Sequence, residues 1–110
     1  MELNETELSV LAKFHEMLAP AFDSGDEYQV IGRTENPTGF MTDLRARKGR
    51  APGDQKIFED LPSAITAGNI TVGFLVYHDG TIVTAIEGYI ADENENWEEK
   101  GGGIEWLSDV

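Results

Sequence analysis

Two histidines, His15 and His78, are the only imidazoles of the 110-residue chain, and imidazole is the side chain best suited to proton transfer near neutral pH. Asp79 follows His78 and could orient it as a general base. Neighbouring residues of a strand point to opposite faces, however, and no nucleophile accompanies the pair. His15 falls among apolar positions at helical spacing, and His78 is expected at the exposed tip of a hairpin. The pattern favours structural roles for both histidines, and their spacing is not typical of a metal site.

A second candidate is Asp92–Asn96 (DENEN), which opens like a calcium loop in which alternate side chains supply oxygen ligands. The match ends there, because Trp97 stands where the tight turn requires glycine and Gly103 stands where the bidentate acid should be. We expect no metal site, and interpret the segment as a solvated acidic loop or a partner-binding surface. The chain contains no cysteine, which excludes disulfides, thiolate zinc sites and thiol nucleophiles.

Basic side chains gather in the middle of the chain. Six of the eight Lys and Arg residues lie between residues 33 and 56, namely Arg33, Arg45, Arg47, Lys48, Arg50 and Lys56. Residues 45–50 hold four of these cations without an aromatic platform, which on a chain of net charge −13 is only a weak indication of nucleic-acid binding, and we predict no direct nucleic-acid partner. No glycine-rich loop follows a strand and opens a helix, and we predict no bound cofactor.

The last third of the chain is strongly acidic and holds both tryptophans. From residue 79 to residue 110, nine Asp and Glu residues stand against Lys100 alone. Large aromatic side chains rimmed by charge are typical of protein interfaces, because the ring supplies buried area and the charges steer the encounter. We expect Trp97 to be exposed and Trp106 to lie in the core. The predicted partner-binding residues are Asp92, Glu93, Glu95, Trp97, Glu98, Glu99 and Glu105.

The overall charge has a simple interpretation and a functional one. It provides solubility, and it also creates a field that repels nucleic acid and anionic membranes while attracting a basic protein. The first residues, MELNETELSV, are acidic where a signal peptide needs a basic region, and the longest apolar run is far too short to span a membrane. We therefore expect a cytoplasmic protein, and its length predicts one domain over residues 1–110.

A central hairpin at Asp79-Gly80 is the strongest structural signal. Two apolar runs between Ile70 and Ala91 join there, and glycine permits the positive φ that a two-residue turn requires. This turn would place Tyr77 opposite Ile82. One face would then carry Ile70, Val72, Phe74, Val76, Val83 and Ala85, and the other Leu75, Tyr77, Ile82 and Ile86. Because both faces are apolar, we expect a helix on one and a second layer or a partner on the other.

Glu87 interrupts this apolar pattern. Either it lies at the end of the sheet, where its side chain reaches water, or it is a buried carboxylate that needs a partner. The first alternative is favoured. The nearest candidate partners under the second are Arg33, Arg45 and Arg47.

An N-terminal helix is predicted from its capping residues. Asn4 is a suitable N-cap, Glu7 can return the capping-box bond, Leu3 and Leu8 can form a hydrophobic staple, and Pro20 ends the helix. Its expected apolar face contains Leu8, Leu11, His15 and Leu18, widened by Ala12, Phe14 and Met17. We therefore predict an α+β fold, with this helix packed on an antiparallel sheet around the central hairpin.

The other elements are assigned by alternation and turn chemistry. Residues 28–34 and 40–47 are expected to form a second hairpin, whose second strand alternates apolar and charged positions. Residues 48–55 are expected to form a loop, residues 56–69 either a short helical turn or an edge strand, and residues 104–107 a final strand or a docked tail.

The segment GFLVYHDGTIVTAIEGYIADENENWEE resembles a group of small bacterial proteins in which a strand, a DG turn and a second strand ending in a Leu-Glu-Gly-Tyr-like motif precede an acidic tail. The motif stands here as Ile86-Glu87-Gly88-Tyr89. Such proteins are similar to immunity proteins of polymorphic-toxin and contact-dependent inhibition systems, which bind and neutralise a cognate toxin domain, frequently a basic nuclease. The resemblance covers about the last 40 residues and a leading helix. It implies a class of role, and no binding residue is carried over.

The first hypothesis is therefore a non-enzymatic antitoxin whose acidic surface occupies the cationic site of a toxin, as a phosphate backbone would. The alternative is an acidic DNA mimic that inhibits a nucleic-acid-binding protein complex. Two further hypotheses rank below these: a structural or oligomeric module comes third, and a small enzyme comes last.

Overall fold

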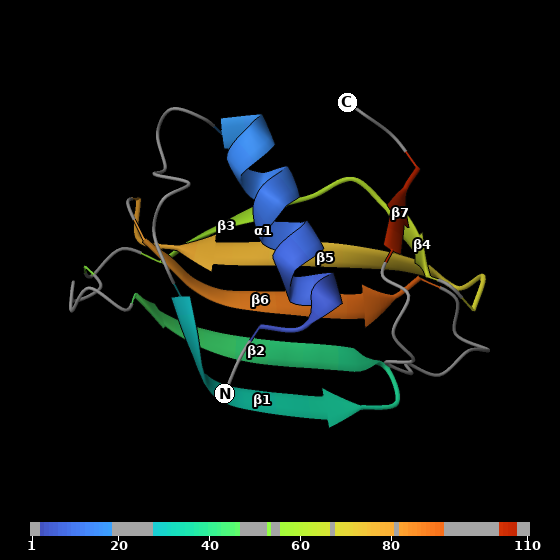
Figure 1. Ribbon diagram of the computed structural model, residues 1–110, viewed down its shortest axis with the longest axis horizontal. Coiled ribbons are helices and arrows are strands. Elements are labelled where there is room, and N and C mark those ends of the chain that lie inside the picture. Colours follow the sequence, from blue (N-terminus) through green and yellow to red (C-terminus); the bar gives the residue numbers. More distant parts are fainter. Residues whose placement is uncertain are drawn as a thin grey trace.

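The protein folds as one helix on an antiparallel sheet in the computed structural model, which describes residues 3–18, 28–46, 53, 56–66, 68–80, 82–91 and 104–107. Helix α1 (Glu5–Leu18) lies across one face of the seven-stranded sheet (Figure 1). The strands are β1 (Tyr28–Asn36), β2 (Gly39–Ala46), β3 (Ile57–Asp60), β4 (Ala64–Thr66), β5 (Thr71–His78), β6 (Val83–Ile90) and β7 (Ile104–Trp106). The predicted α+β fold class is confirmed.

The sheet follows the order β1-β2-β6-β5-β4-β7, with β3 also paired to β5. β3 and β4 therefore share one edge of β5 and form an interrupted line along it. Between them, the Leu61 main-chain N–H donates to the Phe74 carbonyl at 3.0 Å. Pro62 follows and has no N–H to donate, so the ladder stops there. Of the two predicted forms of residues 56–69, a strand is found, divided in two: β3 lies at an edge, whereas β4 is paired on both sides, with β5 and with β7.

The turn between β5 and β6 is longer than predicted. His78 pairs with Val83 and Tyr77 with Ala85, so Asp79–Ile82 forms the loop and the predicted two-residue turn is wrong. The Asp79 main-chain N–H donates to the Ile82 carbonyl at 3.1 Å, and the Ile82 N–H donates to Asp79 Oδ1 at 2.7 Å. These two bonds close a wider loop, in which Ile82 is buried.

This wider loop changes which side chains of β6 face α1. Tyr77 lies opposite Ala85 instead of Ile82, a shift of three positions, and an odd shift exchanges the two faces of a strand. Ile86 therefore joins Phe74 and Val76 in the core, while Ala85 lies on the other face. The faces predicted for Ala85 and Ile86 are corrected accordingly, whereas Val83, opposite His78 and fully buried, keeps its predicted face.

Helix α1 begins with the predicted capping box. The Asn4 N–H donates to Glu7 Oε1 and the Glu7 N–H donates to Asn4 Oδ1, both at 2.8 Å. The buried stripe differs from the predicted one: its members are Thr6, Glu7, Val10, Leu11, Lys13 and Phe14. Leu8 is 54% exposed, because the buried stripe is centred on Glu7, which the sequence pattern counted only as a capping residue.

The hairpin of β1 and β2 is confirmed, with Pro37 and Thr38 in its turn. Inward residues of β2 alternate as expected: Phe40, Thr42, Leu44 and Ala46 are buried. β1 contains a bulge, because Val30 opposes Leu44 and Gly32 opposes Asp43, which leaves Ile31 as the extra residue. After the bulge, Arg33 lies opposite Thr42 and so shares its face, the one that α1 covers.

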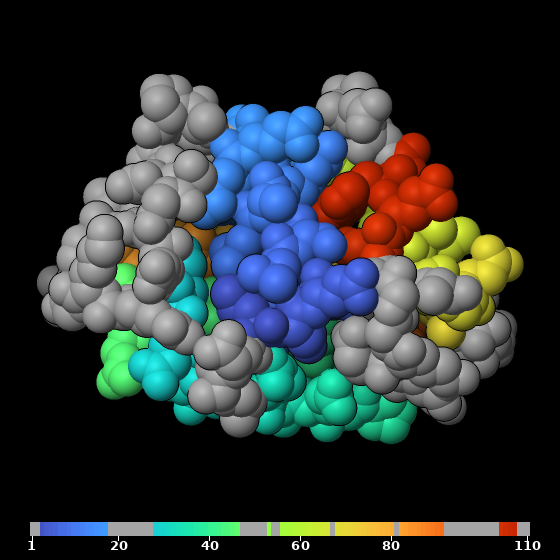
Figure 2. Space-filling view, in the orientation of Figure 1, coloured from blue at the N-terminus to red at the C-terminus, as the bar shows by residue number. Residues whose placement is uncertain are grey.

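Strand β7 closes one side of the core beside α1 (Figures 1 and 2). The Trp106 ring meets the Phe74 ring edge-on, with centroids 5.7 Å apart, in agreement with the predicted core position of Trp106. Lys13 of α1 is buried, and its Nζ lies 5.8 Å from the centroid of the Trp106 ring. A cation over an indole face is attracted by the ring quadrupole, so this contact holds β7 against the helix.

Candidate functional site

Of the predicted partner-binding residues, the structure places Glu105. It is exposed on β7, opposite Ile65 of β4. Asp92, Glu93, Glu95, Trp97, Glu98 and Glu99 lie outside the described residues, as does the whole calcium-like segment. The candidate site consists of titratable and aromatic side chains within the described ranges.

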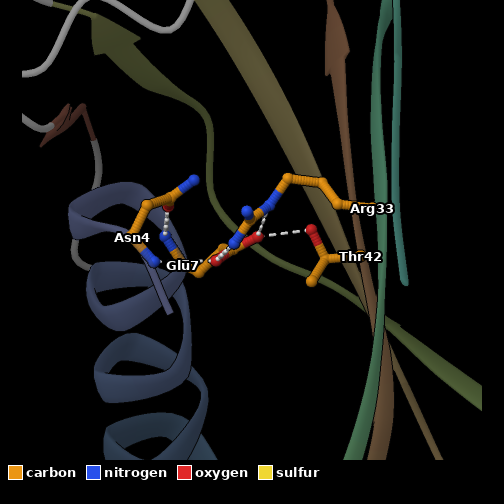
Figure 3. A network of polar contacts seen from close by, with 4 residues as sticks. All are labelled: Asn4, Glu7, Arg33 and Thr42. Atoms are coloured by element: carbon orange, nitrogen blue, oxygen red, sulfur yellow. Dashed lines mark hydrogen bonds and ion pairs between the residues drawn. The ribbon is translucent and has the colours of Figure 1, made fainter. Parts of the chain in front are cut away.

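A buried polar network joins α1 to the sheet through Glu7 (Figure 3). Arg33 donates from Nε to Glu7 Oε2 at 2.9 Å and from Nη2 to Glu7 Oε1 at 2.6 Å. The Thr42 hydroxyl also donates to Oε2, and the Asn4 N–H donates to Oε1. Glu7 is fully buried. Burial alone would raise the pKa of Glu7, but the hydrogen bonds from Arg33, Thr42 and Asn4 outweigh it and lower that pKa below its ordinary value.

Both carboxylate oxygens of Glu7 therefore accept from donors on the capping box and on two strands. A carboxylate stabilised in its charged form by so many donors is a weak base. The network therefore fixes the position of α1 on β1 and β2.

His78 is buried at 5% exposure, and its predicted position at an exposed tip is wrong. The reason is that the loop is wider and that β3 pairs alongside, placing Ile57 opposite His78. The Gly80 N–H donates to His78 Nδ1 at 3.0 Å. The ring proton consequently lies on Nε2, which faces Glu59 Oε1 at 3.3 Å. His78 thus links the loop to β3, and its ring also contacts Phe14, with centroids 5.7 Å apart.

The sheet face opposite α1, called here the rear face, combines aromatic, apolar and acidic side chains. It carries Met41, Asp43, Phe58, Asp60, Leu75, Tyr77, Ala85, Glu87 and Tyr89, as the strand pairings require. Phe58 is 62% exposed and lies against the Tyr77 ring at 6.2 Å between centroids. The single helix within the described ranges packs on the opposite face.

Glu87 lies in the middle of the rear face, opposite Leu75 of β5 and Met41 of β2. The favoured prediction that it sits at the end of the sheet is wrong, because the register shift moves it away from Val72. It accepts a hydrogen bond from the Tyr77 hydroxyl at 2.7 Å. This bond, followed by burial, raises the pKa of Tyr77 above 10.0. The neutral phenol is therefore fixed as a donor to the carboxylate.

Tyr89 makes a second pairing of the same kind. Burial, and then the negative charge of Asp60 and a hydrogen bond to it, raise the pKa of Tyr89 above 10.0. Its ring lies directly over Gly73, where an added Cβ would come within 2.3 Å of the ring. The glycine thus makes room for the aromatic side chain on the rear face.

Beside these pairs, the rear face is hollowed by a cavity of 410 Å³. Its walls are formed by Met41, Asp43, Gly53, Lys56, Tyr77, Thr84 and Ala85. Asp43, Ala85 and Tyr77 are direct cross-strand neighbours on β2, β6 and β5. The site therefore offers an apolar floor, a carboxylate, a phenol ring and an ammonium group.

Sequence reasoning missed most of this site, although parts of it carried a signal. The alternation of β2 already placed Asp43 on the face away from Thr42. The contributions of Tyr77 and Ala85 depend on the hairpin register, and that of Phe58 depends on the pairing of β3. Within the described ranges, His, Asp and Glu side chains form no group of three or more that could hold a metal ion.

Comparisons of the chain with protein-family models, curated proteins and solved structures found no match. The helix within the described ranges is too short and too polar to cross a membrane.

Proposed function

We propose that the protein is a cytoplasmic, non-enzymatic immunity protein that binds and neutralises a toxin domain with a basic surface, of which a nuclease is the expected kind. The motif resemblance suggests an immunity role, and the acidity of the surface supports a partner with a positively charged surface. The predicted acidic segment with Glu105, and the rear face of the sheet, are the two surfaces available to such a partner.

One structural observation carries this proposal: the fold withdraws cations from the surface. Four of the eight Lys and Arg residues are described, and two of these, Lys13 and Arg33, point into the interface between helix and sheet. Of the ten described Asp and Glu residues, only Glu7 is buried. Within the described ranges, the surface is consequently somewhat more acidic than the composition of those residues indicates, and a negative field raises the rate of association with a basic protein.

The test has two stages. Tagged protein is used to capture partners from its native cell lysate at low salt, alongside a variant in which Glu93, Glu95, Glu98 and Glu99 are changed to Gln. Each captured basic protein is then expressed in a host with and without this chain. The proposal requires a captured protein that arrests growth alone and permits growth together with the chain. Captured proteins without any growth effect would contradict it.

The same charge favours one other function, an acidic DNA mimic that inhibits a nucleic-acid-binding complex. The two proposals differ in the partner. A mimic should compete with duplex DNA for a protein that is harmless when expressed alone, whereas an immunity protein should rescue growth. In both cases the association rate should fall by roughly tenfold or more between low and high salt, because surface charges are then screened.

A further inference from the structure

We propose that the cavity on the rear face is an anchor site for an arginine side chain of the basic partner. This inference rests on the proposed function and deepens it, since it names the position and the chemistry of one contact. The occupant to which we commit is an arginine on the surface of a folded protein partner.

The walls of the cavity match the parts of an arginine side chain. The Asp43 carboxylate is exposed and can accept two parallel N–H bonds from a guanidinium group. The Tyr77 ring forms another wall, on which the planar guanidinium can stack. Met41 and Ala85 provide apolar contact for the aliphatic stem. Each chemical part of arginine therefore has a counterpart.

The Tyr77 ring is fixed in place before any partner binds. Its hydroxyl donates to Glu87 at 2.7 Å, and its ring packs against Phe58. An aromatic wall held by its neighbours loses little side-chain freedom on binding, which favours affinity. Phe58, at 62% exposure, extends the contact area beyond the cavity and can be covered by the surface around the arginine.

Charge on the rear face also favours a cation. Asp60 and Glu87 belong to the neighbouring row of side chains on the sheet, where both lie opposite Leu75 of β5. Among the residues that the structure describes, two cations act against these carboxylates: Arg45, whose Nη2 donates to Gln29 at 2.8 Å, and Lys56, which lines the cavity itself. Lys56 repels an entering guanidinium, so its removal should strengthen binding.

The first experiment tests the anchor without the partner. N-acetyl-arginine amide is titrated into the whole protein labelled with ¹⁵N, and amide shifts are followed by NMR. Saturable shifts should concentrate at Asp43, Tyr77, Thr84 and Ala85 and disappear in the Asp43→Asn variant. N-acetyl-norleucine amide, which lacks the charge, should leave them unchanged. Shifts spread evenly over all exposed acids, or no shifts, would overturn the anchor.

The second experiment uses the partner identified by the growth test. Asp43→Asn should weaken its binding by about tenfold or more, and Tyr77→Ser should do the same, as expected of an anchor contact. Tyr77→Phe keeps the ring and should change affinity by less than about threefold. Lys56→Met should tighten binding. The matched control is Glu35→Gln, which removes the same charge at an exposed site on the other face.

The outcomes separate the two proposals. Equal effects of Asp43→Asn and Glu35→Gln would overturn the anchor and leave the immunity function standing. Arginine binding without any growth-arresting partner would keep the anchor and overturn the function. A second copy of the chain is the competing occupant of this face: a dimer in sedimentation that Phe58→Ser dissociates would overturn the anchor, because self-association would cover the cavity.

Discussion

Glu7 and Arg33 are separated by 26 residues in the chain, yet they form a two-bond ion pair between the first turn of α1 and the edge strand β1. The carboxylate is fully buried, whereas the guanidinium retains some contact with water. The pair therefore joins local helix capping to long-range packing through one side chain.

Breaking this pair on one side should destabilise the protein strongly. Arg33→Met leaves the Glu7 carboxylate buried without its cation, and we expect the free energy of unfolding to fall by about 3 kcal/mol. Glu7→Met combined with Arg33→Met leaves no unpaired charge and should cost less than Arg33→Met alone, apart from the loss of the capping bond. Urea denaturation measures both. An equal or larger loss in the double variant would show that the ion pair itself is not the dominant contact.

The same carboxylate should make stability depend on acid. The pKa of Glu7 in the folded protein lies below its ordinary value of 4.5. A lowered pKa contributes stability that is fully present above the unfolded value and is lost as the pH falls through the folded one. We expect the stability difference between wild type and Glu7→Gln to be constant from about pH 7 to about pH 5.5 and to shrink below it. Denaturation at a series of pH values checks this, and a difference that grows in acid would contradict it.

The parts of the fold that depend on neighbours in sequence could be predicted, and the rest could not. The capping box of Asn4 and Glu7 spans three residues, and the alternation of β2 is visible within eight. The hairpin register depended instead on the Asp79 carboxylate, which closes a loop wider than the one that its glycine neighbour favours.

Contacts between elements that are distant in the chain could not be predicted from the sequence either. Arg33 faces α1 because Ile31 forms a bulge that the sequence pattern does not reveal. His78 is buried because β3 and Phe14 meet it from other parts of the chain. Much of the candidate site follows from such pairings, whereas of the site predicted from sequence the structure places only Glu105, exposed on β7.

The His78 ring should stabilise the protein through contacts with the loop, with β3 and with α1. His78→Ala removes the acceptor of the Gly80 N–H, the contact with Phe14 and the bond to Glu59. We expect a loss of about 2 kcal/mol, since a partly buried donor is left unpaired and a cavity forms. Glu59→Ala should cost less than about 1 kcal/mol, because that partner is partly exposed. Equal losses of the two variants in denaturation would show that the contact between His78 and Glu59 carries the stability instead.

The pKa values of the two rear-face tyrosines, Tyr77 and Tyr89, should depend on different carboxylates. Glu87→Gln should lower the pKa of Tyr77 toward 10.0, because its hydrogen bond to a charged acceptor is lost. Asp60→Asn should instead lower the pKa of Tyr89, for which Asp60 is the nearer charge. Both raised pKa values contribute stability that is fully present below pH 10.0, the ordinary value, and is lost as the pH rises through the pKa of the folded protein. NMR titration of the ring signals distinguishes them, and a larger response of Tyr89 than of Tyr77 to Glu87→Gln would contradict the assignment.

Two glycines of the central strands should respond differently to the same substitution. An added Cβ at Gly88 would come within 2.3 Å of the Phe40 ring, and one at Gly73 within 2.3 Å of the Tyr89 ring. Phe40 is buried in the core and cannot withdraw, so Gly88→Ala should destabilise by about 1–3 kcal/mol. Tyr89 is 37% exposed, and its ring can swing toward solvent, so Gly73→Ala should cost less than about 1 kcal/mol. Denaturation of the two variants tests the order. Because the displaced ring carries the Tyr89 hydroxyl away from Asp60, Gly73→Ala should also lower the pKa of Tyr89, whereas Gly88→Ala should not change it through this route.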